Sequence, residues 1–241
     1  MLVMNAMDVM DDPRVRREAE TAAQAGYKVV VIGRSLSADD PRREQDHGVT
    51  VIRVRNLLPR LFITREKAPS VLREGEFLIR AFMANLQIAV KAIGLGADIY
   101  HAHEIGALPV GYALKRLTGA KLVYDAHELY TETSSMEKAS RWFRGLFEAV
   151  QSYILPKVDA ITTVGEAIAQ EIYRRYKCAR PVTLRNCPHW EQPDATQRDA
   201  LREALGLAKD QKMVLFQGAY LPYRGLKQIV ESAKFLQKDG V

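Results

Sequence analysis

The sequence predicts an α/β fold in which helices cover both faces of a doubly wound parallel sheet. The main observation is that short apolar runs, each suited to one buried strand, alternate with amphipathic helical patterns over most of the 241 residues. Several of these runs lead directly into titratable side chains, as expected where parallel strands end at a ligand crevice. A hydrophobic content of 47% and a charged content of 27% are ordinary for a soluble globular protein and exclude a disordered chain.

The chain opens with a β-α-β pattern. Residues 2–5 form a short apolar run, and Asp12 followed by Pro13 supplies an N-cap and a first-turn proline for a helix that Gly26 ends. Residues 27–32 then indicate a buried strand. The arginines in the first turn of the helix break a local rule, because cations are disfavoured at the positive end of the helix dipole. We therefore expect a bound anion near this terminus, the alternative being arginines that are simply solvated.

Strands and helices continue to alternate to about residue 190. Residues 33–48 are polar and rich in turn formers, and residues 131–138 are expected to form a mobile loop. The remaining predicted strands are 49–54, 97–104, 120–124, 158–164 and 181–184, and the predicted helices are 73–95, 105–117, 142–154 and 165–177. Seven strands with helices between them indicate a Rossmann-like, doubly wound sheet.

The predicted domain boundary follows this sheet. Residues 1–190 are assigned to the Rossmann-like domain, residues 191–199 to a polar linker, and residues 200–241 to a second domain. The last segment contains a short helix, a predicted strand at 213–217 and a predicted helix at 226–236. One strand and one helix cannot bury their own apolar faces, so we expect an incomplete second α/β domain and a chain that is a fragment or a truncated product.

The composition favours anionic partners and a reducing compartment. The formal net charge of +6 at pH 7 suits nucleotide phosphates, lipid head groups or nucleic acid. Nucleic acid is the least favoured, because the basic residues are scattered and neither a recognition motif nor an aromatic platform accompanies them. Cys178 and Cys187 lack a metal-binding spacing, and the N-terminus shows no secretory signal, so a cytoplasmic protein is expected.

Contact with a membrane surface is a further expectation. Residues 53–73 interleave basic with apolar side chains, a pattern typical of a segment that lies on a bilayer or receives a lipid acceptor. The alternative is a loop that packs its apolar residues on the core with its charges outward. The apolar helix at 76–95 carries Arg80 and Lys91, which argues against a membrane span. The expected location is therefore the cytoplasm, with peripheral contact at the inner face of the cell membrane.

Polar side chains gather where the predicted strands end. Residues 121–130, KLVYDAHELY, place Asp125, His127 and Glu128 at the end of one strand. The ends of the other strands carry Arg14, Arg16, His103, Glu104, Glu166 and Asn186. Because the carboxyl ends of parallel strands share one edge of a sheet, these side chains predict a ligand crevice there.

His127 is the candidate catalytic residue in this crevice. A histidine beside Asp125 and Glu128 can be held in one tautomer and kept basic near neutral pH, as a general base requires. The alternative is a structural histidine that caps the strand end. A metal site that combines His101 and His103 with Asp125 and His127 is also conceivable, but interior histidines more often bond to the backbone, so no metal is expected.

A second candidate site lies at residues 216–226. Gly218 follows the predicted strand, and Arg224 with Gly225 opens the following helix, which outlines a phosphate cradle. The stretch lacks both G-x-G-x-x-G and a Walker lysine, so it is a weak signal by itself.

Together these stretches resemble the family-4 glycosyltransferases, whose GT-B fold has two Rossmann-like domains that face each other across a cleft. The matching stretches are MDDPRVRREAETAAQAGYKVVVI, DIYHAHEIGALP, VYDAHELY, VDAITTVGEAIAQEI, LRNCP and VLFQGAYLPYRGLKQIVESA. The resemblance implies that residues 1–190 are the acceptor-side domain. It implies transfer of a sugar from a nucleoside-diphosphate sugar to a glycan or lipid-linked acceptor, with retained anomeric configuration and without a cofactor or an obligatory metal.

The resemblance also implies roles for single residues. His127 would lie near the reacting sugar. Arg14, Arg16, His103, Glu104, Asp125 and Glu128 would line the acceptor side. Arg224, with Gly218 and Gly225, would contact the donor diphosphate and stabilise the charge that grows as it leaves.

The chain departs from the family pattern in three places. Many relatives have a Gly-Gly loop where this chain has Asp12 and Pro13, and Ala219 stands where a basic residue is common. The paired glutamates of the donor domain would lie beyond Val241, so this chain alone is expected to be inactive. Two alternatives stay open, a nucleotide-sugar epimerase or hydrolase on the same fold and a catalytically incomplete binding module. The sequence carries no signal for an oligomeric state.

Overall fold

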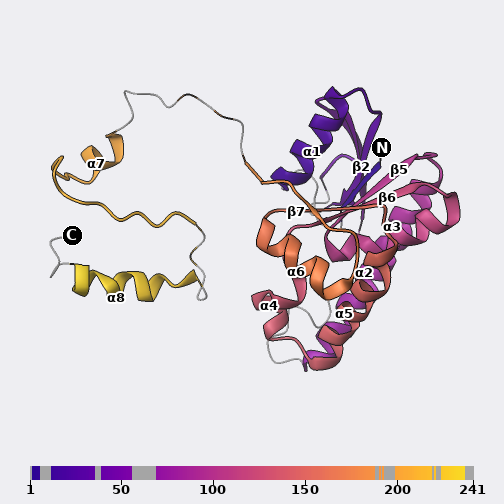
Figure 1. Ribbon diagram of the computed structural model, residues 1–241. Coiled ribbons are helices and arrows are strands. Elements are labelled where there is room, and N and C mark those ends of the chain that lie inside the picture. Colours follow the sequence, from indigo (N-terminus) through magenta and orange to yellow (C-terminus); the bar gives the residue numbers. More distant parts are fainter. Residues whose placement is uncertain are drawn as a thin grey trace. The chain divides into compact units, whose positions relative to one another are not determined.

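The chain divides into two compact units, Met1–Asn186 and Cys187–Val241 (Figure 1). The computed structural model describes residues 2–5, 12–35, 39–55, 69–187, 190, 192, 199–218, 220 and 224–236. The larger unit contains the sheet and its helices. Of the predicted linker at 191–199, only Gln192 and Asp199 belong to the described residues.

One sheet organises the larger unit. Its described strands are β1 Leu2–Asn5, β2 Val29–Arg34, β3 Arg43–Asp46, β4 Val49–Val54, β5 Ile99–His103, β6 Lys121–Ala126, β7 Ala160–Thr163 and β8 Val182–Thr183. They lie in the order β3-β4-β2-β1-β5-β6-β7-β8. Every neighbouring pair is parallel except β3 and β4. The chain fills one half of the sheet before it crosses to the other, so the direction of winding reverses between β1 and β5, where such folds bind ligands.

The helices lie on both faces of this sheet (Figure 1). They are α1 Pro13–Gln24, α2 Ser70–Ile93, α3 Glu104–Thr118, α4 Ser134–Glu137, α5 Arg141–Ile154 and α6 Glu166–Tyr176, with the 3₁₀ turns η2 Tyr130–Glu132 and η3 Leu155–Lys157. The predicted doubly wound, Rossmann-like fold of the larger unit is confirmed.

The alternation of side chains in β2 shows how the two cores form. Val29 and Val31 pack with α1, whereas Val30 and Ile32 belong to the larger core on the other face, which includes Ile88 of α2. In a strand with both faces covered, the side chains on both faces are buried. This explains why β2 is a nearly continuous apolar run. Each fully buried aliphatic side chain of this kind stabilises the fold by about 1.5–3 kcal/mol.

The start of α1 follows from its capping residue. The Asp12 carboxylate accepts hydrogen bonds from the backbone N–H of Arg14 at 3.0 Å and of Val15 at 3.4 Å. Pro13 occupies the first helical position, where its missing N–H leaves no bond unmade. The predicted N-cap is confirmed, and it sets the position of the arginines in the first turn of α1.

Two segments of the larger unit differ from the prediction. Residues 33–48 contain the end of β2 and the edge strand β3, so the sheet has eight described strands where we predicted seven. The strand is short, polar and antiparallel, and an edge strand of this kind gives no apolar run to detect. The expected mobile loop at 131–138 is also wrong, because η2 and α4 order it around Thr131 and Met136, which are both buried.

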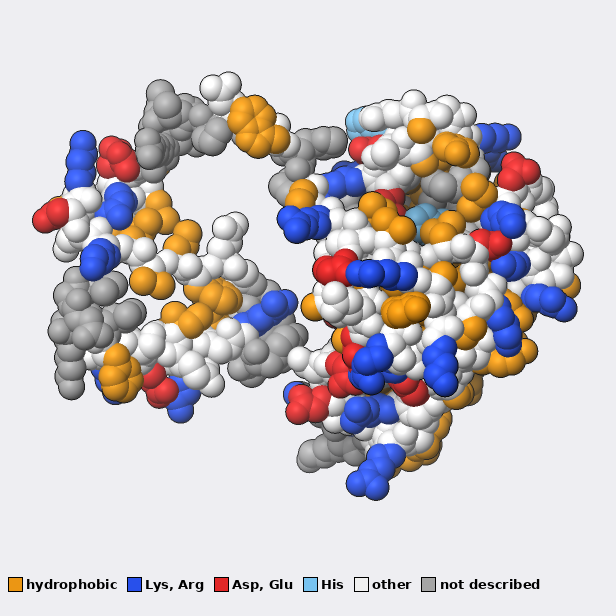
Figure 2. Space-filling view, in the orientation of Figure 1, with side chains coloured by type: hydrophobic (Ala, Val, Ile, Leu, Met, Phe, Trp, Pro, Cys, Tyr) orange, Lys and Arg blue, Asp and Glu red, His pale blue; other side chains and the backbone are white. Residues whose placement is uncertain are grey.

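The smaller unit contains α7 Ala200–Ala204 and α8 Leu226–Leu236, and the prediction of α8 is confirmed. The predicted strand at 213–217 is wrong, since these residues have no regular secondary structure. Val214 is 67% and Leu215 62% exposed, and Figure 2 shows hydrophobic side chains at the surface of this unit. A strand needs a neighbour for its backbone donors and acceptors, and the described part of this unit provides none.

Candidate functional site

The ends of three neighbouring strands bring the candidate residues into one row. In the parallel register, His103 of β5 lies beside Asp125 of β6, and Asp125 lies beside Thr162 of β7. On the other side of β5, the register pairs His103 with Asn5 of β1. This row lies at the reversal of winding between β1 and β5, so the sequence-based expectation of a shared strand edge agrees with the topology.

Asp125 is the centre of the row and is fully buried. The guanidinium of Arg14 grips it with two bonds, from Nε to Oδ2 at 2.5 Å and from Nη2 to Oδ1 at 2.6 Å. Thr162 Oγ1 donates to the same Oδ1 at 2.6 Å. Burial alone would raise the pKa of Asp125, but hydrogen bonds from Arg14, His103 and His127 outweigh it and hold this pKa far below its ordinary value. Asp125 is therefore a permanent carboxylate.

The contacts of Arg14 explain why a cation lies in the first turn of α1, where the helix dipole disfavours it. Its side chain is only 4% exposed, and besides Asp125 it contacts Glu18, with 3.1 Å between Nε and Oε1. Its Nη1 also donates to the carbonyl oxygen of Leu184 at 2.8 Å. The expected anion is thus a carboxylate of the protein itself, 111 residues away in the chain. Arg17, one residue after Arg16, donates from Nη1 to Asn186 Oδ1 at 2.5 Å.

His127 lies between two carboxylates. Its Nε2 is 3.0 Å from Asp125 Oδ2 and its Nδ1 is 3.2 Å from Glu104 Oε1. Burial alone would lower the pKa of His127, but the bonds to Asp125 and Glu104 raise it to about 10. The ring is therefore an imidazolium at neutral pH. A proton donor or a fixed positive charge fits this state, whereas a general base requires the neutral ring.

Glu104 rather than Glu128 provides the second contact to His127. The backbone of Glu104 has φ +60°, a left-handed conformation that a residue with a side chain adopts only when its surroundings impose it. It is the first residue of α3 and directly follows β5. Glu128 is exposed, and partial burial and the charge of Glu104 raise the pKa of its carboxyl. Its carboxylate is therefore accessible to a ligand.

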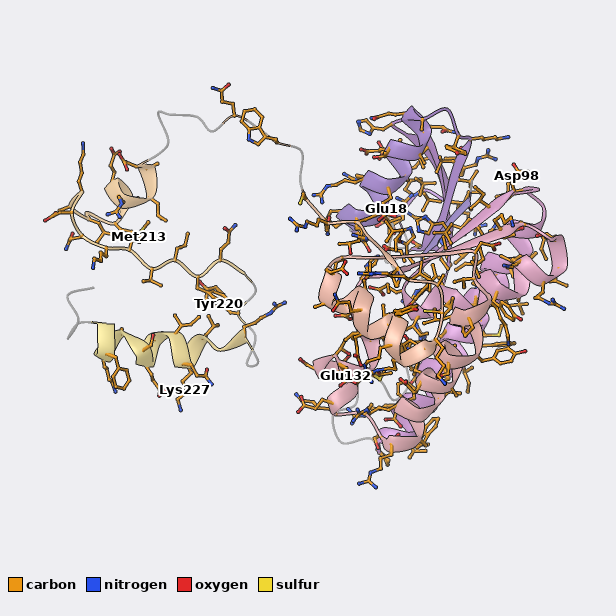
Figure 3. The ribbon with its side chains drawn as sticks, viewed as in Figure 1. Glu18, Asp98, Glu132, Met213, Tyr220 and Lys227 are labelled. Atoms are coloured by element: carbon orange, nitrogen blue, oxygen red, sulfur yellow. The ribbon has the colours of Figure 1, made fainter. Side chains whose placement is uncertain are left out.

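His103 and His101 lie deeper, on the same side of β5. His103 Nδ1 is 3.4 Å from Asp125 Oδ2, and burial lowers the pKa of both histidines, so both rings are neutral near pH 7. Glu18 of α1 faces them and is labelled in Figure 3. Burial and the charge of Asp125 raise the pKa of Glu18 to about 7. Sequence reasoning missed Glu18 and Thr162; the i, i+4 spacing of Glu18 from Arg14 was the only available signal.

The predicted diphosphate site belongs to the smaller unit. Gly225 has φ +70° and directly precedes α8, so the backbone N–H groups of the first turn of this helix follow a glycine in a conformation that suits a tight turn. Arg224 is exposed beside it, and Gly218 has φ +153°. The anion site that the sequence predicts at the start of α8 therefore stays a prediction.

Comparisons with known proteins agree with this fold. Residues 12–187 match a family model described as a glycosyl transferase 4-like domain. A comparison with curated proteins found no match. Among solved structures, sucrose-phosphate synthase from Thermosynechococcus elongatus is similar with a TM-score of 0.69 and 20% identity over 98% of this chain and 59% of that one.

Two further solved structures share the architecture. The Anabaena protein HepE in complex with UDP and glucose gives a TM-score of 0.51 at 13% identity over 85% of this chain and 49% of its own. The UDP-forming α,α-trehalose-phosphate synthase from Burkholderia vietnamiensis gives 0.50 at 13% identity, over 97% of this chain and 54% of its own. At these identities the likeness shows the fold, and the chain spans between about half and three fifths of the length of these three relatives.

Proposed function

Because the chain belongs to the glycosyl transferase 4-like family, we propose that it forms the acceptor-side half of an enzyme that transfers a sugar from a nucleoside-diphosphate sugar to an acceptor. The observation that carries the proposal is the position of His127 where the sheet reverses its winding, held between the carboxylates of Asp125 and Glu104, which raise its pKa. The UDP bound to HepE supports a nucleoside diphosphate as the leaving group. The transfer retains the configuration at the anomeric carbon, as the resemblance to family-4 enzymes implies.

Each group in the crevice has a task that suits its charge. In the transition state the bond from the anomeric carbon to the diphosphate breaks, and negative charge grows on the leaving oxygen while the sugar becomes electron-poor. When the donor binds, the Nδ1–H of the His127 imidazolium turns from the Glu104 carboxylate to an oxygen of the donor and stabilises the growing negative charge, while the Nε2–H stays on Asp125. Glu104 and Glu128 accept hydrogen bonds from acceptor hydroxyl groups, whereas Arg16 lines a different hollow with Glu20 and Asp46.

Asp125 and Arg14 position this group rather than touch the substrate. Asp125 is fully buried, and among the described residues it contacts the side chains of Arg14, Thr162 and His127. Its permanent charge sets the protonation of His127, and Arg14 fixes its orientation. In the smaller unit, Gly218, Arg224 and Gly225 bind the diphosphate through backbone N–H groups and a guanidinium.

A product assay separates this function from its alternatives. The gene product expressed from its own locus, whatever residues follow Val241, is expected to release nucleoside diphosphate only when acceptor is present. Release without an acceptor would identify a hydrolase, and isomerised donor without release would identify an epimerase. A protein that binds the donor or acceptor and turns over neither would be a binding module, and any of these three results would overturn the transferase proposal.

The acceptor is proposed to be a glycan carried on a lipid, met at the membrane surface. No described helix is both long and apolar enough to cross a bilayer. However, α2 presents an apolar stripe to solvent, with exposed side chains at Leu72, Ile79, Phe82, Leu86, Val90 and Ile93. Their spacing of three, four or seven residues places them on one side of the helix, opposite the buried Ala84 and Ile88. We call this face the α2 stripe.

Basic and aromatic residues beside the α2 stripe favour an anionic bilayer as its partner. On α2 itself Arg73 and Lys91 are exposed, and α5 adds exposed Arg141, Arg144 and Trp142. The two helices touch, since the Glu74 carboxylate accepts hydrogen bonds from the backbone N–H and hydroxyl of Ser140 at 2.8 and 2.6 Å. Apolar residues with flanking cations and tryptophan are typical of helices that lie in the lipid headgroup region. Residues 56–68, whose interleaved pattern gave the same expectation, lie outside the described residues.

Two serine substitutions test the α2 stripe. The protein is expected to co-sediment with phosphatidylglycerol vesicles more strongly than with phosphatidylcholine vesicles. Phe82→Ser with Val90→Ser should weaken this binding about tenfold or more, because each buried apolar side chain contributes roughly 1.5–3 kcal/mol. Val182→Ser is the matched control, since Val182 is 58% exposed on β8 and Val90 is 66% exposed. Equal loss in the control, or a wild-type dimer that the double substitution dissociates, would contradict the membrane assignment.

A further inference from the structure

Three polar groups between α1 and β5 converge without a hydrogen bond among them. The Nε2 atoms of His101 and His103 are buried and have no hydrogen-bond partner among the residues that the structure describes. Glu18 Oε2 lies 3.6 Å from His101 Nε2 and 4.0 Å from His103 Nε2. Buried polar atoms nearly always have a partner, so a group that joins these three atoms is expected.

The backbone explains why these side chains meet. Residues at i and i+2 of a strand share one face, and the rings of His101 and His103 lie with their centroids 4.3 Å apart and tilted by 31°. Glu18 is held opposite them because its second oxygen, Oε1, is 3.1 Å from Arg14 Nε. Figure 3 shows Glu18 where α1 meets the sheet.

A count of donors and acceptors identifies what the group must supply. A neutral imidazole has one N–H. His103 Nδ1 lies 3.4 Å from Asp125 Oδ2, which can only accept, and 3.4 Å from His127 Nε2, whose own proton is directed to the nearer Asp125 Oδ2 at 3.0 Å. The N–H of His103 is therefore assigned to Nδ1. His103 Nε2 then presents a lone pair to Glu18, and a carboxylate also presents lone pairs. Acceptors that face one another are stabilised by a shared proton or by a cation. His101 Nε2 is buried beside them and completes a set of three ligand atoms, which favours a cation.

We propose that Glu18, His101 and His103 bind a divalent transition-metal ion of the zinc type, through Oε2 of the glutamate and Nε2 of each histidine. Ligand atoms of a tetrahedral zinc site lie about 3.3 Å apart, so the observed 3.6 and 4.0 Å must shorten by about 0.3 and 0.7 Å when the ion binds. Asp125 supplies the carboxylate that commonly holds the far nitrogen of a zinc-bound histidine. The ion joins α1 to β5 and fixes the tautomer of His103. The site is independent of the transferase proposal.

Two other clusters lack the features of this site. Asp125 with His103 and His127 also brings three ligand atoms together, but Arg14 and Thr162 already bond to its carboxylate. Glu20, Asp46 and His47 form a third group, in which the side chain of His47 is 73% exposed. An exposed group of this kind is solvated without an ion, so it provides an internal control.

Metal binding by the chain tests the site directly. The full chain, stripped with a chelator, is expected to bind one Zn²⁺ per molecule in titration calorimetry and to show the intense visible bands of tetrahedral Co²⁺ when Co²⁺ replaces it. Glu18→Gln and His101→Gln should each reduce the affinity at least tenfold, as loss of a ligand does. His47→Gln should leave both the stoichiometry and the spectrum unchanged, and circular dichroism confirms that each variant is folded.

Three results would overturn the proposal. They are a wild-type chain that binds neither ion, a stoichiometry that survives both ligand substitutions, and a loss of binding in His47→Gln. The first would assign the space to a proton shared between Glu18 and the two histidines. The second and third would place the ion elsewhere.

Discussion

Replacing Arg14 with methionine is expected to lower the free energy of unfolding by about 3–5 kcal/mol, the usual effect of removing one partner of a buried ion pair. Arg14 is 4% exposed and Asp125 is fully buried, so the substitution leaves the carboxylate with one hydroxyl and two histidines in place of a two-pronged guanidinium. Urea denaturation of the purified chain, followed by circular dichroism, measures the change.

Arg17→Met is the matched control for this experiment. It makes the same substitution on the same helix, but its contact with Asn186 is at the surface, so a change within about 0.5 kcal/mol is expected. Equal losses for the two substitutions would show that the Arg14 pair has no special role.

The acid dependence of stability should change as well. The pKa of Asp125 is lowered by folding, so its contribution is present above the unfolded pKa of about 3.9 and is lost as the pH falls below it. Without Arg14, folding lowers the pKa of Asp125 by a smaller amount. The stability of Arg14→Met is therefore expected to fall less steeply than that of the wild type as the pH drops below about 4.

Replacing His127 with glutamine is expected to lower kcat/KM for sugar transfer about a hundredfold, the effect of removing one preorganised hydrogen-bond donor. The pH profile distinguishes its role. Because the pKa of His127 is raised to about 10, the wild-type rate should be level through neutral pH and fall as the pH approaches this value. A general base would give a rate that rises with pH over the same range.

Two further measurements support that comparison. The titration of the His127 ring can be followed by NMR in the chain itself, without turnover. For the transfer assay, His47→Gln is the control variant, because His47 is exposed and its loss should leave kcat/KM unchanged. A ring that titrates near its ordinary pKa of about 6.5 would contradict the assignment of His127 as a donor.

The sequence predicts the positions of the site better than its contacts. The strand ends at His103 and Asp125 follow from apolar runs that stop at polar residues, and the start of α1 follows from Asp12 and Pro13. The bond between Arg14 and Asp125 spans 111 residues, and no local pattern encodes a partner at that distance. Glu104 was placed in the crevice, but its contact with His127 depends on a left-handed backbone that the sequence does not specify.

The incorrect predictions have the same physical origin. The run at 213–217 has the composition of a strand, but composition cannot supply the neighbouring strand whose backbone it requires. The polar strand β3 shows the reverse case, because its pairing with β4 makes a strand from residues with no strand pattern. Both cases are decided by what lies beside the segment in space.

The bond from Arg14 Nη1 to the Leu184 carbonyl gives the crevice a mechanical connection to the path by which the chain leaves the sheet. The same guanidinium holds Asp125 with its other two nitrogens, and Arg17 holds Asn186 two residues further along. A shift of the backbone after β8 that displaces the Leu184 carbonyl would therefore also displace the Arg14 guanidinium, which orients Asp125. Because Asp125 bonds to His127, such a shift would change the hydrogen bond that holds the proton on His127 Nε2.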